Sequence, residues 1–136
     1  MNKQIEIQVI DLLKKMIPEL MGIYIFGSYA NNTMTSESDI DIAFLSFQKI
    51  SPVDKWKIQE NLASKLNINV DLVDMKDASV ILRSEIIDNG IRIYTKDTFE
   101  CDNFEVTSYS MYADLNESRI HILNDFKEKY GRNPNK

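Results

Sequence analysis

The chain has 136 residues, 43% of them hydrophobic and 27% charged, which fits a single folded domain spanning residues 1–136 and excludes a disordered or fibrous protein. Its formal charge of -5 argues against broad nucleic-acid binding, and no apolar run resembles a signal peptide or a membrane span. Because the single cysteine, Cys101, cannot form an internal disulfide, we expect a protein of the reducing cytoplasm.

The first part of the chain predicts a helix and two strands. Apolar residues recur every three or four positions over residues 3–20, as in an amphipathic helix. The run Ile-Tyr-Ile-Phe at residues 23–26 ends at Gly27, which is typical of a buried strand that meets a tight turn. After the polar residues 29–38, acidic and apolar side chains alternate over residues 39–44, which predicts a second strand.

The middle of the chain predicts a capped helix followed by a third strand. Ser51 is a favourable N-cap and Pro52 a favourable first helical residue, so we expect a helix over residues 52–66. Trp56 is expected on the inner face of this helix, in the core. The short apolar segment 69–74 predicts the third strand.

The last part of the chain predicts two helices separated by a strand. Asp77 is expected to cap a helix over residues 80–87 that closes at Gly90. Residues 91–94 predict a fourth strand. The longer pattern over residues 104–130 predicts a C-terminal helical segment, either one helix or a broken pair.

This order of elements predicts an α/β (α+β) domain in which helices flank a small sheet of about four strands. The sheet is expected to be mixed in strand direction, because the first two strands are joined without a clear helix. In the terminal segment, Tyr109, Met111 and Tyr112 are expected to pack on the sheet. Alternatively, they form a surface for a partner protein, since aromatic and methionine residues are enriched in interface cores.

The candidate chemistry lies where a Gly-Ser turn precedes a strand with two acids. Asp39 and Asp41 should project from one side of that strand, because strand side chains alternate between faces. Two like charges side by side repel, and a divalent cation relieves the repulsion. Magnesium suits this position, since it prefers oxygen ligands and is commonly shared between carboxylates and phosphates. Gly27 lets phosphate approach the backbone closely, and Ser28 adds a hydroxyl donor.

Asp71 is the third candidate acid. It interrupts an apolar strand, where an unpaired carboxylate is costly to bury, and beside the second strand it would complete a metal cluster. Asp74 should lie on the opposite face and close the strand end. Three acids suit a two-metal mechanism in which one ion activates an attacking hydroxyl and the other holds the triphosphate. Taken singly, the Gly-Ser pair also fits an ordinary turn, and the paired acids an exposed strand edge.

The motif closely resembles that of the DNA polymerase β-like nucleotidyltransferase superfamily. It consists of Gly27 and Ser28, ten intervening residues, the Asp39-Ile40-Asp41 triplet and a later strand acid. The whole chain looks like the minimal MNT type of that superfamily, and residues 112–119 are similar to the closing helix of those proteins. The resemblance implies a polymerase β-like fold and ATP as the donor. It also implies nucleotide binding by Gly27 and Ser28, and catalysis with magnesium held by Asp39, Asp41 and Asp71.

MNT proteins are commonly the antitoxins of HEPN/MNT toxin–antitoxin pairs. The resemblance therefore implies a HEPN ribonuclease toxin as partner, neutralised by transfer of AMP to one of its tyrosines. One departure is that Asn31 and Asn32 stand where the family usually has Arg and Gly. Two alternative hypotheses are an antitoxin that acts by binding alone and an enzyme that modifies a small hydroxyl compound such as an aminoglycoside.

Overall fold

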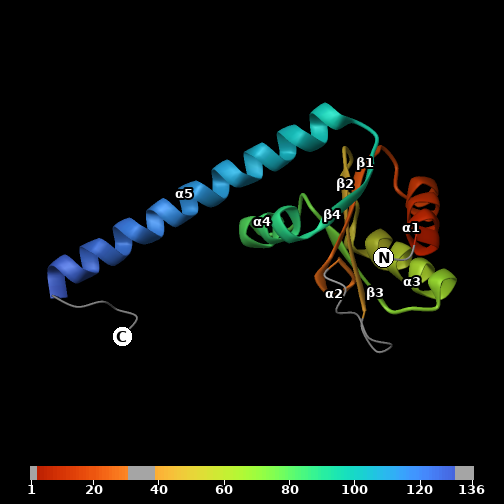
Figure 1. Cartoon of the computed structure of the whole chain (residues 1–136), viewed down its shortest axis with the longest axis horizontal. Coiled ribbons are helices and arrows are strands. Elements are labelled where there is room, and N and C mark those ends of the chain that lie inside the picture. Colours follow the sequence, from red (N-terminus) through yellow and green to blue (C-terminus); the bar gives the residue numbers. More distant parts are fainter. Residues whose placement is uncertain (1–2, 31–38, 131–136) are drawn as a thin grey trace.

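The computed structural model describes the backbone of residues 3–30 and 39–130, and the side chains of these ranges as far as residue 117. The described residues form five helices and one four-stranded sheet (Figure 1). The helices are α1 (Lys3–Met16), α2 (Gly27–Ala30), α3 (Pro52–Leu66), α4 (Val80–Asn89) and α5 (Thr98–Tyr130). The strands are β1 (Leu20–Phe26), β2 (Ile40–Ser46), β3 (Val70–Asp74) and β4 (Ile91–Thr95). None of these helices combines the length and the apolar character that crossing a membrane requires.

The sheet has the strand order β3-β2-β1-β4 and is mixed in direction. β1 runs antiparallel to both β2 and β4, whereas β2 and β3 are parallel. The parallel pair is joined through α3, because parallel neighbours need a crossover connection. The predicted mixed sheet with flanking helices is therefore confirmed.

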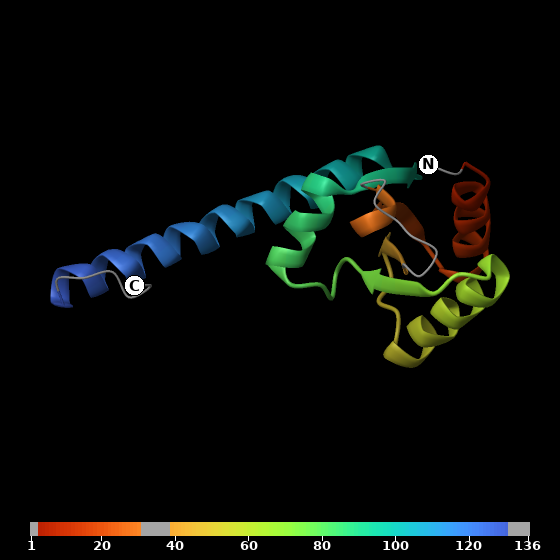
Figure 2. The ribbon, with the colours of Figure 1, turned by 60° about the horizontal axis from the view of Figure 1, so that its bottom comes forward.

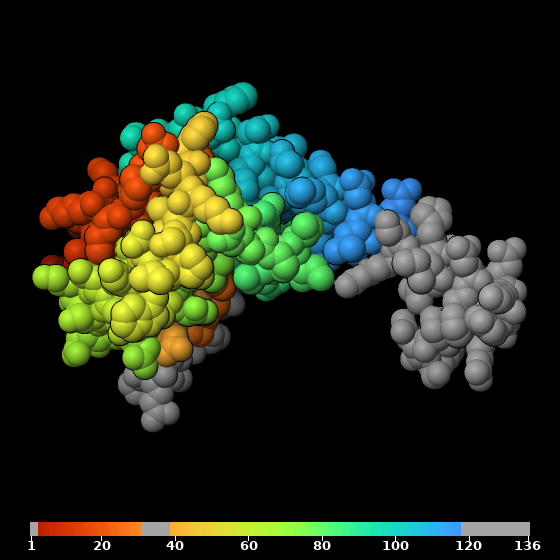
Figure 3. All heavy atoms as spheres, turned by 180° about the vertical axis from the view of Figure 1, so that it is seen from behind, coloured from red at the N-terminus to blue at the C-terminus, as the bar shows by residue number. Residues whose placement is uncertain are grey.

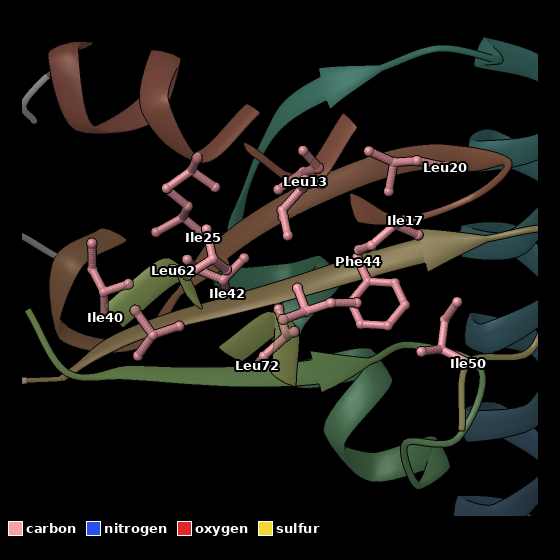
Figure 4. Close-up of a cluster of buried hydrophobic side chains, with 14 of the residues drawn as sticks. Leu13, Ile17, Leu20, Ile25, Ile40, Ile42, Phe44, Ile50, Leu62 and Leu72 are labelled. Carbon is pink, nitrogen blue, oxygen red and sulfur yellow. The ribbon is translucent and has the colours of Figure 1, made fainter. Parts of the chain in front are cut away.

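Each face of the sheet is covered by a different pair of helices. α1 and α3 cover one face and α4 and α5 the other (Figures 1 and 2). Figure 4 shows the main core on the α1/α3 face, where strand residues such as Ile42 and Phe44 meet Leu13 and Leu62 from the helices. A smaller cluster on the α4/α5 face joins Tyr24 to residues of other elements: Met21, Ala43, Leu45, Met75, Ile86 and Cys101.

The predicted caps are confirmed for α3 and corrected for α4. The Ser51 hydroxyl accepts a hydrogen bond from the backbone N–H of Asp54, and Pro52 is the first residue of α3. The cap of α4 is Ser79, whose hydroxyl accepts from the N–H of Leu82, so the prediction of Asp77 was wrong. Asp77 instead lies in the preceding turn, where its N–H donates to the Asp74 carbonyl.

Trp56 does not lie in the core. Its side chain is 59% exposed, whereas Ile58 and Leu62 form the buried side of α3. Trp56 precedes Ile58 by two positions, a rotation of about 200° around a helix, so the two side chains point in opposite directions. The inner face of α3 was therefore assigned wrongly at this residue.

The element boundaries also differ from the predictions at both ends of the chain. α1 ends at Met16 and β1 begins at Leu20, so Gly22 lies within the strand and does not precede it. The terminal segment is one helix of 33 residues, not a broken pair. Tyr109 and Met111 do not pack on the sheet: the Tyr109 hydroxyl donates to Asp88 on α4, and both side chains remain exposed.

An ion-pair network fixes the start of α5 to the sheet. Arg92 on β4 donates to Asp102 at 3.0 Å and to Glu105 at 2.5 Å. The hydroxyl of Tyr24, buried on β1, donates to the same Glu105 oxygen at 3.2 Å. Burial and the nearby negative charge of Glu105 raise the pKa of Tyr24, so this hydroxyl stays protonated and acts as a donor. β1, β4 and α5 are thereby joined at one point.

The core predicts a large difference between two phenylalanines at the end of β2. Phe44 is fully buried, whereas Phe47 is 61% exposed. We expect Phe44→Ala to lower the free energy of unfolding by about 3–5 kcal/mol, through lost apolar burial and the cavity left behind. Phe47→Ala, the matched control, should cost less than about 0.5 kcal/mol. Equal losses for the two variants in urea denaturation would contradict this description of the core.

Candidate active site

The Gly-Ser turn follows directly from the end of β1. Gly27 has φ +70°, a conformation that side chains other than glycine rarely adopt. A Cβ atom at this position would lie 2.1 Å from Oδ2 of Asp41, far closer than atoms can approach. The backbone of the turn therefore lies against the Asp41 carboxylate, and only glycine permits that approach.

Strand pairing brings Asp41 and Asp71 together. They are register partners in the parallel β2–β3 pair, and Asp41 also pairs with Phe26 across the antiparallel β1–β2 pair. Alternation along the strands places both carboxylates on the α4/α5 face, with Ala43 and Val73. The two acids and the Gly27 turn thus meet at one end of the sheet, although more than forty positions separate Gly27 from Asp71 in the sequence.

Asp39 lies one residue before β2 and is exposed, as is Asp71, whereas Asp41 is half-buried. The backbone here is held by the N–H of Ile40, which donates to the carbonyl of Asn69 at 2.8 Å. The structure therefore gathers all three predicted acids around the same strand ends.

The three acids repel one another. Burial, the negative charge of Asp71 and the negative charge of Asp39, in that order, raise the pKa of Asp41 above its usual value. All three causes disfavour the ionised carboxylate, so the folded chain holds a charge conflict at this position. A cation would remove the conflict.

The chemistry of these residues suits a magnesium ion that takes few protein ligands. Within the described residues, no three or more His, Cys, Asp or Glu side chains are positioned to hold a metal ion together. Magnesium does not need such a cage, because it keeps several waters and takes phosphate oxygens along with one or two carboxylates. The neighbouring carboxylates of Asp41 and Asp71, which repel each other beside the Gly27 turn, fit that donor set. Residues Asn31 and Asn32 lie outside the described residues.

Asp74 differs from the three acids in position and surroundings. It is buried at the end of β3, on the face opposite to Asp71, as expected. Its Oδ1 accepts from the backbone N–H of Lys76 at 3.0 Å, so it closes the strand end as expected. Burial raises the pKa of Asp74, but its carboxylate is occupied by the turn that follows the strand.

Sequence reasoning missed the part played by Gly90. A Cβ atom there would lie 3.0 Å from the carbonyl oxygen of Ile25 and 3.3 Å from Cβ of Phe26. The end of α4 therefore abuts the end of β1, immediately before the Gly27 turn. The sequence marked Gly90 only as the end of a helix, since a contact between distant elements leaves no local pattern.

A hollow of about 370 Å³ lies at the opposite end of the sheet from the acids. It is close to the start of β1 and the end of β2, whereas the acids lie at the end of β1 and the start of β2. Its lining residues are Glu19, Leu20, Met21, Phe47, Lys96 and Asp97. None of the predicted site residues lines it, so the site is defined by the acids and the turn and not by this hollow.

Comparison with known proteins matches the part of the chain that holds the Gly27 turn and the three acids. The family model "Polymerase beta, Nucleotidyltransferase" matches residues 7–99, which include the turn and all three acids. The protein adenylyltransferase MntA of Shewanella oneidensis is 37% identical over 120 residues, covering 88% of this chain and 86% of that protein.

Solved structures of toxin–antitoxin complexes resemble this fold. A chain in a crystal structure of a toxin–antitoxin with AMP-PNP is 37% identical, with a TM-score of 0.81 over 88% of this chain and 96% of that chain. A chain in a second structure is 34% identical, with a TM-score of 0.78. That structure is described as the tri-AMPylated HEPN toxin of Shewanella oneidensis in complex with MNT antitoxin. The match covers 92% of this chain and 98% of that one. These matches confirm the predicted resemblance: this chain belongs to the polymerase beta nucleotidyltransferase family.

Proposed function

We propose that this chain is a protein adenylyltransferase that acts as an antitoxin. It transfers AMP from ATP to a tyrosine hydroxyl of a HEPN-family ribonuclease toxin and so neutralises the toxin. The proposal is supported by the identity to MntA and by the similarity to chains crystallised with AMP-PNP and with an AMPylated HEPN toxin. The observation that carries it is the pairing of Asp41 with Asp71 against the Gly27 turn.

The turn and the acids have different roles in the proposed reaction. Gly27 and Ser28 hold the triphosphate through backbone N–H groups and the Ser28 hydroxyl. The tyrosine oxygen attacks the α-phosphorus of ATP, the bond from that phosphorus to the β-phosphate oxygen breaks, and pyrophosphate leaves. Asp71 accepts the proton of the tyrosine hydroxyl. Orientation and charge neutralisation supply most of the rate enhancement in such transfers.

Asp39, Asp41 and Asp71 would hold two Mg²⁺ ions, which supply charge neutralisation for the triphosphate and for the leaving pyrophosphate. The raised pKa of Asp41 supports this assignment, because a site that repels its own charges gains most from a cation. The free, buried Cys101 and the use of ATP suit a reducing, cytoplasmic setting.

Replacement of two acids should separate transfer from binding. We expect Asp39→Asn/Asp41→Asn to reduce the AMP labelling of the purified toxin by radiolabelled ATP and magnesium at least about a hundredfold. Asp11→Asn/Asp54→Asn makes the same charge change on exposed residues of α1 and α3 and should label normally. Undiminished labelling by the first variant would contradict the proposal.

The same experiment tests the two alternatives. An antitoxin that works by binding alone would still neutralise the toxin, at unchanged affinity, when it carries Asp39→Asn/Asp41→Asn. An enzyme for small compounds would label an aminoglycoside in a panel of hydroxyl compounds and leave the toxin unlabelled.

The contact between Gly27 and Asp41 predicts a stability effect that depends on both residues. Gly27→Ala should lower the free energy of unfolding by about 1–2 kcal/mol from the positive φ alone, and further from the clash of its Cβ with the Asp41 carboxylate. In an Asp41→Ala background the clash is absent, so the same substitution should cost less. Additive losses in chemical denaturation of the single and double variants would show that the two residues do not touch.

The charge conflict predicts a pH effect in the metal-free protein. Asp71→Asn removes a negative charge beside Asp41, so the pKa of Asp41 should fall towards its usual value. Asp41 would then remain ionised at lower pH than in the unsubstituted protein. NMR titration of the Asp41 carboxyl carbon measures this shift, and Asp54→Asn serves as the control. An unchanged or higher Asp41 pKa would contradict the proximity of the two acids.

A further inference from the structure

α5 extends well beyond the body of the protein. It has 33 residues and packs against α4 and β1 near its start, after which it projects away from the sheet (Figures 1 and 2). Figure 3, seen from behind, shows the described atoms of α5 extending past α4. A long helix in water is stabilised mainly by packing of one face. The projecting part of α5 therefore offers a surface on which another protein can pack.

The described side chains divide α5 into an inner and an outer face. The inner face carries the buried Cys101 and Ser108 and the half-buried Phe104 and Tyr112. The outer face, on the opposite side, consists of exposed residues: Phe99, Val106, Ser110, Ala113 and Asp114.

The outer face of α5 has a pattern suited to helix packing. Phe99, Val106 and Ala113 follow one another at intervals of seven residues, so they lie along one line of the helix, with polar residues such as Asn103 and Ser110 between them. Val106 is 63% exposed although it is a β-branched apolar residue in a helix. Aligned, exposed apolar residues of this kind mark surfaces for other proteins.

The described part of α5 is acidic, and Asp114 carries that charge on the outer face. Residues 98–117 contain no Lys or Arg, and five acids: Glu100, Asp102, Glu105, Asp114 and Glu117. Glu105 and Asp102 are paired with Arg92, whereas Asp114 is exposed. A ribonuclease binds the RNA polyanion through a positively charged surface, so an acidic helix is electrostatically complementary to it.

α5 and the three acids occupy the same side of the sheet. The inner face of α5 packs on the α4/α5 face, to which Asp41 and Asp71 also project. The Arg92 network joins α5 to β1 and β4, so the direction of the helix is set relative to the sheet. The inner side of α5 is thus anchored to the face that carries Asp41 and Asp71, and the outer face of the helix points away from the sheet.

We propose that the outer face of α5 is the docking surface for a basic surface of the HEPN toxin. The identity of the partner rests on the proposed function, whereas the surface rests on exposure, spacing and charge. The similar chain crystallised as a toxin–antitoxin matches over 88% of this chain, a span that includes part of α5.

Two matched double variants test the surface. Val106→Lys/Asp114→Lys reverses the charge of the outer face of α5, and Val53→Lys/Glu60→Lys makes the same change on α3, across the sheet. Val53 is 62% exposed, almost the same as Val106, and Glu60 is exposed like Asp114. All four residues lie on the surface, so both variants should fold, as circular dichroism would verify.

Calorimetry of each variant with the purified toxin measures the effect. We expect the α5 variant to raise the dissociation constant about tenfold or more and to raise the KM for the toxin with kcat unchanged. The α3 variant should bind like the unsubstituted protein, and both should bind ATP normally. The affinity of the unsubstituted protein should fall as salt is added, and that of the α5 variant should fall less.

The outcomes separate this inference from the proposed function. Equal toxin affinity for the two double variants would overturn the docking surface, even if the toxin is still AMPylated. Failure of the unsubstituted protein to bind the toxin would overturn it as well. Normal binding through α5 without any AMP transfer would leave the docking surface in place and overturn the adenylyltransferase assignment.

Discussion

Electrostatic repulsion at one end of the sheet is the constraint on which the rest of the site depends. The parallel register of β2 and β3 sets Asp41 beside Asp71, and the turn at Gly27 is pressed against the Asp41 carboxylate. Strand pairing fixes the backbones of both acids, and a residue with a Cβ in place of Gly27 would clash with the Asp41 carboxylate as it stands. The folded chain therefore holds an unfavourable interaction that a divalent cation would relieve.

The apolar core makes that repulsion tolerable. β1 and β2 are buried on both faces over most of their length, and the large cluster with α1 and α3 holds their register. Because strand side chains alternate, the residues that anchor β2 in this cluster, Ile40 and Ile42, direct Asp41 to the other face. The alternation of side chains along β2 thus buries Ile40 and Ile42 in the core and at the same time positions the Asp41 carboxylate on the other face.

The α4/α5 face combines the chemistry with a means of holding a large substrate. A small sheet of this size offers little surface of its own around the acids. α5 adds a long acidic helix on the same side, tied to the sheet through Arg92, Glu105 and Tyr24. The proposed docking surface on this helix and the proposed transfer to a protein acceptor thus use elements that pack on the same face of the sheet.

Local sequence patterns determined the elements and the candidate residues. The cap at Ser51, the apolar run before Gly27 and the alternation around Asp41 each depend on neighbours in the chain, so they could be interpreted without a structure. The family resemblance rests on the same residues, and it predicted the fold and the family correctly.

Only the tertiary structure decided which of these residues meet and which faces stay uncovered. The pairing of Asp41 with Asp71, the contact of Gly90 with β1 and the choice of Ser79 over Asp77 as a cap depend on elements far apart in the chain or on the path of a turn. Trp56 and the outer face of α5 are exposed although both are apolar in part. Periodicity shows that a helix has an apolar side, but what covers that side is fixed by long-range packing or by another protein.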